Sequence, residues 1–289
     1  SSNDLVNDTW MTDSGRALYK LVDSNERILR PSVDGTDLPL NQVISQASLN
    51  LKNRKIGIVA SCHSTLEEQF LIRYLADETH AKVFLRGHFS DDDGILLSAD
   101  RSPNLRGALA SGLTKEYPTS RLNSLDEQLA SGDFDVLLVV GEDLADSGVS
   151  SENLKNTDII FVGSHQNSTS VLSKIVIPGL TVFEKSGSFI NRSFLLQSFE
   201  EAIPSPVGLK PDWMIYSEIL KIISGDYSDI QTFDDVWKLF STENGSILSQ
   251  VNFSDSLDHA ISIDASEWAG LPFVEKEALN YVPNKHLID

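Results

Sequence analysis

The chain has 289 residues, 40% of them hydrophobic, so it can bury one large core or two moderate ones. Its formal net charge of −19 opposes binding to nucleic acids or anionic membranes, and no apolar run reaches the roughly 20 residues of a membrane span. The single cysteine, Cys62, excludes an intrachain disulfide and a cysteine-ligated iron–sulfur cluster within this chain, and it suits a reducing cytoplasm.

In chain order, the first 36 residues are polar and irregular, with a short strand pair expected over 17–22 and 28–31. Helical spacing of apolar residues then alternates with short apolar runs. The helices are expected over 39–51, from 66 and from 102 onward, and over 122–131, 211–224 and 232–240. The strands are expected over 55–60, 81–85, 94–98, 135–140, 158–162 and 174–177. This alternation indicates an α/β fold, a mostly parallel sheet with flanking helices and irregular terminal additions.

Local signals mark the beginnings of two helices. Ser64 and Glu67 have the spacing of a capping box, in which the serine caps the helix and the glutamate reaches back. Thr232 is expected to cap a later helix. Residues 242–289 are expected to be irregular, apart from a strand around Val282.

Seven short segments form an ordered set of motifs. They read N-D-T-W-M-T-D-S-G-R (7–16), A-S-C-H-S-T-L-E-E (60–68), A-D-R-S-P-N-L-R-G-A (99–108), S-H-Q-N-S-T-S (164–170), I-V-I-P (175–178), F-E-K-S-G-S-F-I-N-R (183–192) and K-P-D-W (210–213). The set resembles the molybdopterin oxidoreductases, and in particular the G subunit of bacterial NADH:quinone oxidoreductase, respiratory complex I. The resemblance runs from about Asn7 to Ser224 and implies the α/β domain of that family.

The first motif departs from the family pattern at one position. In the family, N-x-x-W-x-C-D-x-G-R closes the iron–sulfur domain, and its Cys is the last ligand of a [4Fe–4S] cluster. Thr12 stands at that position here. Because a neutral hydroxyl cannot replace a thiolate on iron, the resemblance implies a lost cluster ligand and no metal site there.

Two other departures concern the family's cofactor, molybdopterin guanine dinucleotide. Members that bind it have Ala-Asp before the V-V-L-P strand, where this chain has Ser173-Lys174 after Leu172. They also have Gly-Arg where this chain has Phe194-Leu195, which removes a cation useful for phosphates and crowds a ligand. No Cys or Ser is recognisable as a molybdenum ligand. We therefore expect neither the dinucleotide nor a [4Fe–4S] cluster in this chain.

The resemblance still marks a vestigial cofactor cleft, since α/β folds bind ligands at the ends of their strands. Its candidate residues are Ser61, His63, Asp100, Arg101, Gly141, Glu142, His165, Thr169, Glu184 and Asn191. No residue is expected to be catalytic. The adjacent Cys62 is interpreted as a buried thiol.

Other candidates have a structural interpretation that we favour. Asp100 and Arg101 are expected to anchor their own loop. Glu184, Asn191 and Arg192 are expected to satisfy backbone groups of an irregular segment rather than bind an anion. His88 beside the acidic run 91–93 could form a hard-metal site, but a solvated acidic run is the favoured interpretation.

The resemblance implies three parts: a remnant of the end of the iron–sulfur domain over 1–36, an α/β domain over 37–209, and a helical and irregular extension packed on it over 210–289. The favoured hypothesis is a catalytically silent structural domain of a G-type subunit, excised or degenerate, that braces the peripheral arm of complex I. Expected partners are other peripheral-arm subunits, including the iron–sulfur and NADH-binding subunits, at the cytoplasmic, inner face of the membrane. Two alternatives stay open: an active molybdenum or tungsten pterin oxidoreductase module, and an α/β module that binds a small metabolite.

Overall fold

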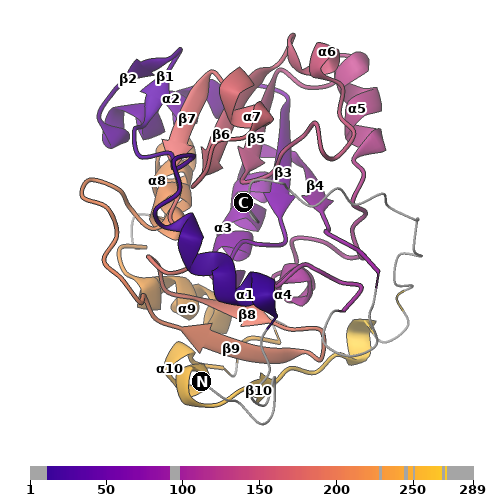
Figure 1. Ribbon diagram of the computed structural model, residues 1–289, viewed down its shortest axis with the longest axis vertical. Helices are drawn as coiled ribbons and strands as arrows, with labels where there is room; N and C mark the ends of the chain where they lie inside the picture. Colours follow the sequence, from indigo (N-terminus) through magenta and orange to yellow (C-terminus); the bar gives the residue numbers. More distant parts are fainter. Residues whose placement is uncertain are drawn as a thin grey trace.

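The centre of the molecule is a seven-stranded sheet in the order β2-β1-β7-β6-β5-β3-β4 (Figure 1). Its strands are β1 (Ser32–Val33), β2 (Thr36–Asp37), β3 (Ile56–Ser61), β4 (Lys82–Arg86), β5 (Val136–Val140), β6 (Asp158–Gly163) and β7 (Ile175–Pro178). Strands β3 to β7 pair in parallel, whereas β1 and β2 add a short antiparallel edge. The computed structural model describes residues 12–91, 98–227, 230–243, 247–249, 251–268 and 271. The expected α/β class with a mostly parallel sheet is confirmed.

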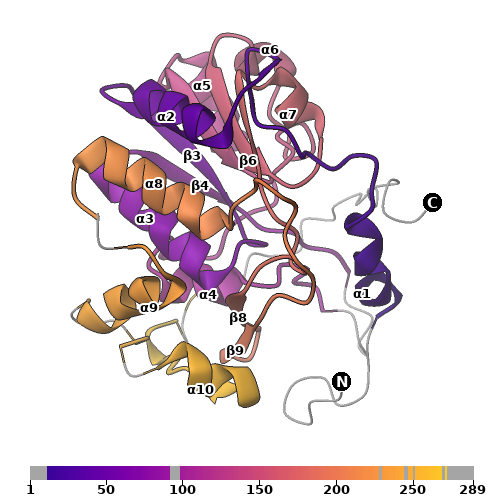
Figure 2. The same ribbon diagram turned by 90° about the vertical axis from the view of Figure 1, so that its left-hand side faces the viewer.

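Helices cover both faces of this sheet (Figure 2). The helices on one face are α2 (Leu40–Leu51), α3 (Leu66–Thr79) and α8 (Asp212–Ser224), and those on the other are α5 (Asn123–Ala130) and α6 (Ser151–Leu154). Alternate residues of one strand serve the two faces: Leu138 packs with the first group, and Leu137 and Val139 pack with the second. Because both faces are covered, every residue of β3 and β5 is buried, as the continuous apolar runs predicted.

A second, antiparallel sheet in the order β10-β9-β8 lies beyond the first turn of α3 (Figure 1). Its strands are β8 (Gly187–Ile190), β9 (Leu195–Phe199) and β10 (Ile261–Ser262), and the helices near it are α4 (Leu105–Ala110), α9 (Phe233–Thr242) and α10 (Phe253–Asp258). Trp237 and Phe240 of α9 belong to the same hydrophobic core as α3 and α8. Within the described residues, no helix is long and apolar enough to cross a membrane.

The expected strand pair at the beginning of the chain is wrong. Residues 13–21 form α1 (Asp13–Ala17) and a 3-10 turn, and 28–31 form no strand. Thr12 caps α1, because its hydroxyl accepts a hydrogen bond from the Gly15 N–H at 3.1 Å. Tyr19 is 64% exposed, so its ring stays outside the core.

The capping box of α3 is displaced by one residue from the prediction. Thr65 is the N-cap and Glu68 reaches back to it, although Ser64 and Glu67 have the same spacing. Glu67 is fully buried instead and accepts hydrogen bonds from Ser188. The Glu67 carboxylate therefore lies in the interior, whereas the capping-box pattern predicted it at the end of the helix.

Other expected boundaries have mixed outcomes. The helix expected from residue 102 begins at Leu105, whereas Thr232 caps α9 as predicted. The short helix α7 (Ser168–Leu172) was not expected. Most of the expected strand 94–98, and the strand expected around Val282, lie outside the described residues.

Candidate functional site

Polar side chains meet at the carboxyl ends of β3, β4 and β5. Ser61 is the last residue of β3 and His63 follows it, Arg86 ends β4 with His88 two residues later, and Glu142 comes two residues after β5. β3 pairs in parallel with both β4 and β5, so the three ends lie side by side. These five residues are called the Glu142 cluster below. This edge is where open α/β sheets place their ligands.

Glu142 is the centre of the cluster and is only 3% exposed. The Ser61 hydroxyl donates to Oε1 at 2.5 Å, and the Arg86 guanidinium donates to Oε2 at 3.2 Å. His88 Nε2 lies 3.2 and 3.1 Å from the two carboxylate oxygens. Burial raises the pKa of Glu142, but the charges and hydrogen bonds of His88, His63 and Arg86 outweigh burial and bring this pKa to about 2. The carboxylate is therefore ionised near neutral pH.

His63 completes the cluster from the solvent side. Its ring keeps contact with solvent and stands edge-on to that of His88, with 4.7 Å between the centroids. Desolvation by the surrounding protein atoms, then the charge of His88, lowers the pKa of His63 to about 4. One ligand-type atom from each of His63, His88 and Glu142 lies within 4.8 Å of the others. The group offers two imidazole nitrogens and one carboxylate oxygen.

Sequence reasoning found part of this cluster. Ser61, His63 and Glu142 were candidates, and the structure brings them together. His88 was considered as a metal ligand, but its partners are His63 and Glu142 rather than the acidic run, of which only Asp91 is described. Arg86 was missed: like Ser61 it directly follows an expected strand, but none of the seven motifs contains it. Its place beside Glu142 depends on the order of β5, β3 and β4 in the sheet, which the sequence alone does not reveal.

The other candidates near this edge make structural contacts. Asp100 forms an ion pair with Arg106, and Arg101 donates to the backbone carbonyl of Asp91, so both anchor their loop as expected. The buried Thr169 hydroxyl accepts from the Leu144 N–H at 2.8 Å. Gly141 takes a left-handed conformation, with φ of 66°, where β5 turns into its loop.

The remaining candidates also serve the fold. His165 Nε2 lies 2.9 Å from the Leu21 carbonyl oxygen. Glu184 pairs with Arg27 at 2.9 Å and accepts from the Thr181 N–H and hydroxyl, each at 2.8 Å. Glu184 therefore contacts both its own segment, at Thr181, and the distant Arg27.

Asn191 and Cys62 also have the roles expected of them. The Asn191 side-chain oxygen accepts from the N–H groups of Ser193 and Leu195. Cys62 is fully buried, and burial followed by the charges of Glu142 and Asp100 raises the pKa of its thiol.

The diphosphate of molybdopterin guanine dinucleotide would need cations or free N–H groups at this edge. The buried cations of this edge already face carboxylates in four groups: Arg27–Glu184, Arg86–Glu142, Arg106–Asp100, and Lys185 with Glu68 and Asp212. Among the described residues, N–H donors on Arg27 and Arg86 lack partners, but each guanidinium is already paired with a carboxylate. A diphosphate here would meet the Glu142 carboxylate.

Phe194 also bears on the space available to a ligand. It keeps a left-handed backbone, with φ of 55°, at the position where the resemblance places a glycine. Its ring stacks on Trp268, with 5.4 Å between the centroids and 3° between the planes. The residue therefore packs against the 3-10 turn Ser266–Trp268.

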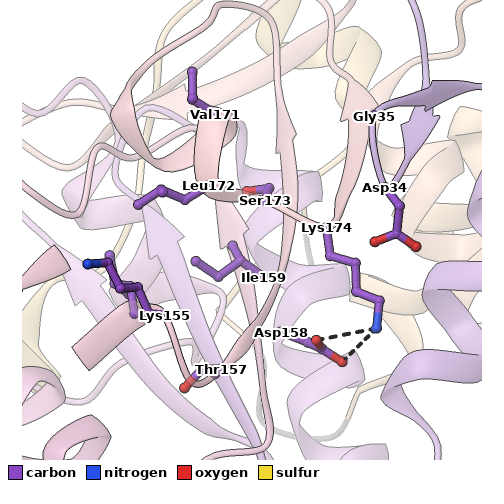
Figure 3. Close-up of a pocket in the computed structure, with 11 residues that line it drawn as sticks. Asp34, Gly35, Lys155, Thr157, Asp158, Ile159, Val171, Leu172, Ser173 and Lys174 are labelled. Atoms are coloured by element: carbon purple, nitrogen blue, oxygen red, sulfur yellow. Dashed lines mark hydrogen bonds and ion pairs between the residues drawn. The ribbon is translucent and has the colours of Figure 1, made fainter. Parts of the chain in front are cut away.

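Two open cavities lie at the opposite, amino ends of the strands. The first, of about 570 Å³, is lined by residues that include Asp34, Asp158, Leu172 and Lys174 (Figure 3). Lys174 Nζ lies 3.2 and 3.3 Å from the two Asp158 oxygens. The second, of about 810 Å³, opens where β3 and β4 begin. Neither adjoins the Glu142 cluster.

Comparisons with known proteins agree with the motif order. Residues 16–222 match the family model described as molybdopterin oxidoreductase. Among solved structures, the protein is similar to one component of the formyltransferase/hydrolase complex of Methylorubrum extorquens, determined with methylofuran, at 10% identity over 67% of this chain and 98% of that one, with a TM-score of 0.49. A search of curated proteins finds no match. Because the family model covers well over half of the sequence, the chain belongs to the molybdopterin oxidoreductase family.

Proposed function

We propose that this protein is a catalytically silent structural domain of a G-type subunit of NADH:quinone oxidoreductase, which braces the peripheral arm of complex I. The observation that carries the proposal is the state of the ligand-binding edge. Arg86 is neutralised there by the buried Glu142 of the same chain. In a family member whose own carboxylate occupies this edge, the fold is kept. An anionic cofactor there would have to lie beside that buried negative charge.

The beginning of the described chain supports the same proposal. Thr12 stands where the resemblance places a cluster ligand, and its oxygen is used to cap α1. A hydroxyl engaged in this way serves the helix rather than iron.

The proposed partners are other peripheral-arm subunits, including the iron–sulfur and NADH-binding subunits, at the inner face of the membrane. The net charge of −19 favours association with basic surfaces. Leu18, Tyr19 and Leu29 are 41%, 64% and 51% exposed, which gives the N-terminal segment an apolar surface for a neighbouring subunit.

Affinity capture of the tagged full chain from its own organism tests this proposal. Complex I subunits should be recovered with it, and plasma mass spectrometry should find neither molybdenum nor tungsten near one atom per chain. Either metal at that level would overturn the silent role in favour of an active pterin module. Capture without any complex I subunit would overturn the placement.

Two surface variants test whether the N-terminal segment is the part that binds the partners. Leu18→Ser combined with Tyr19→Ser should reduce recovery of partners, because it removes apolar surface from the N-terminal segment. Leu49→Ser is the matched control, since Leu49 is also exposed, at 59%, but lies on α2. Equal losses in both variants would contradict a role for the N-terminal segment.

A further inference from the structure

We propose that His63, His88 and Glu142 bind a divalent transition metal ion, with Zn²⁺ as the best match, at the carboxyl ends of β3, β4 and β5. The site is independent of any iron–sulfur or molybdenum chemistry of the family. It uses side chains from three loops that the parallel sheet brings together.

The donor set selects the class of ion. Two imidazole nitrogens and one carboxylate oxygen suit Zn²⁺ and neighbouring transition ions, whereas Mg²⁺ and Ca²⁺ prefer sets made of oxygen atoms. Three protein ligands leave at least one position for water or another small ligand. His63 faces solvent, so an ion has a route to the site.

The distances are close to those that such an ion requires. In a tetrahedral zinc site with bonds of about 2.0–2.2 Å, ligand atoms lie about 3.3–3.6 Å apart. His88 Nε2 is already 3.1 Å from Glu142 Oε2, and the whole set lies within 4.8 Å. Within the described residues, the His63 ring makes no hydrogen bond, so it can turn toward the other two ligands without breaking one.

The surroundings hold the other two ligands in place. Ser61 donates to one carboxylate oxygen of Glu142, while the backbone of His88 is fixed by the Arg101 N–H and the Ser102 hydroxyl. Such supporting contacts orient metal ligands and strengthen binding.

Arg86 is the unfavourable neighbour, because its charge lies beside the same carboxylate. Its Nη1 also donates to the Asp143 backbone carbonyl at 2.9 Å, so it keeps a partner when Glu142 turns to an ion. The competing explanation is a plain His88–Glu142 ion pair. That explanation leaves the third donor, His63, without a purpose beside the pair.

Titration of the chelator-stripped full chain with Zn²⁺ by calorimetry, and with Co²⁺ by visible absorption, tests the site. One ion per chain should bind. His63→Ala should weaken binding by more than the ~10–100-fold that loss of a supporting residue costs, because it removes a direct ligand. Since His63 is exposed and its ring has no hydrogen bond within the described residues, this variant should keep the fold.

His88→Ala and Glu142→Gln should have the same effect, with Glu142→Gln scored only if its circular dichroism matches the parent. The matched controls are His80→Asn and His259→Ala, which change exposed histidines elsewhere. His80 has φ of 53°, and asparagine tolerates that conformation. Binding that survives His63→Ala, or that is lost in a control, would overturn the proposal, as would no binding at micromolar zinc.

Discussion

The two ends of the central sheet carry the same kinds of charged residue in opposite settings. At the carboxyl end, Lys185 contacts Glu68 and Asp212, and the three side chains are 9%, 3% and 8% exposed. At the amino end, Lys174 contacts Asp158, and these two side chains are 38% and 30% exposed. The difference teaches that an ion pair in this fold must be judged by its surroundings, since a buried charge depends on its partner far more than a hydrated one.

The largest effect is expected from Lys185→Ala. Removing this amine leaves Glu68 and Asp212 facing each other in the interior, where unpaired charges are costly. The free energy of unfolding should fall by about 3–5 kcal/mol, measured by urea denaturation at pH 7. The loss should shrink at acidic pH, where Glu68, whose pKa burial already raises, can take up a proton. A loss below about 1 kcal/mol would mean that the triad behaves like a surface pair.

A pH-dependent effect of nearly this size is expected from Glu67. Burial raises its pKa to about 7, although Ser188 and Trp237 donate hydrogen bonds to it. Between pH 4.5 and 7 the folded state keeps a proton that the unfolded state has lost, so stability should fall as pH rises through that window. The shift corresponds to about 3 kcal/mol.

Glu67→Gln should remove this slope, because an amide does not titrate. Denaturation curves at a series of pH values from 4 to 8 provide the measurement. The parent and the variant should differ most in slope between pH 5 and 7. Parallel stability profiles over that range would contradict the assignment.

Asn104→Ala should have a somewhat smaller effect. The Asn104 side chain accepts from the Ile190 N–H at 2.8 Å and donates to the Ser64 carbonyl and the Gln69 side chain. Its loss leaves buried polar groups unpaired, so thermal or urea unfolding should report about 2–3 kcal/mol of destabilisation. The control is Asn153→Ala, which removes a half-buried asparagine at the outer face and should cost less. Equal costs would argue against a special role for Asn104.

The smallest effect is expected at the amino end. Lys174→Ala should change the free energy of unfolding by less than about 1 kcal/mol, since Asp158 is partly hydrated and keeps Arg54 as a partner. The difference from the parent should decrease further in high salt. A loss comparable to that of Lys185→Ala would break the comparison between the two ends.

The sequence predicted the parts of the fold that carry a strong local signal. The apolar runs of β3 and β5 and the apolar spacing of α8 are each sufficient to identify their elements. The two-residue strands β1 and β2 are too short for any periodic pattern. The strand expected over 17–22 is instead the 3-10 turn Leu18–Leu21, a single turn too short to show a helical period.

The candidate site was predictable only in pieces. Ser61, His63 and Glu142 each follow an expected strand, so the rule for α/β ligand sites finds them singly. Their meeting with His88 depends on β3 lying between β4 and β5. That order is not the order along the chain, and a single sequence does not reveal it.

The position of helix α8 late in the chain affects folding during translation. Its residues Ile215, Ile219 and Leu220 are fully buried in the core that covers one face of β3 and β5. During synthesis the strands of the central sheet, the last of which ends at Pro178, leave the ribosome before this helix does. Until α8 emerges, the nascent sheet exposes apolar surface, and such surface promotes association with chaperones or with other nascent chains. Stalling translation between residues 178 and 212 should therefore trap an aggregation-prone intermediate that release of α8 resolves.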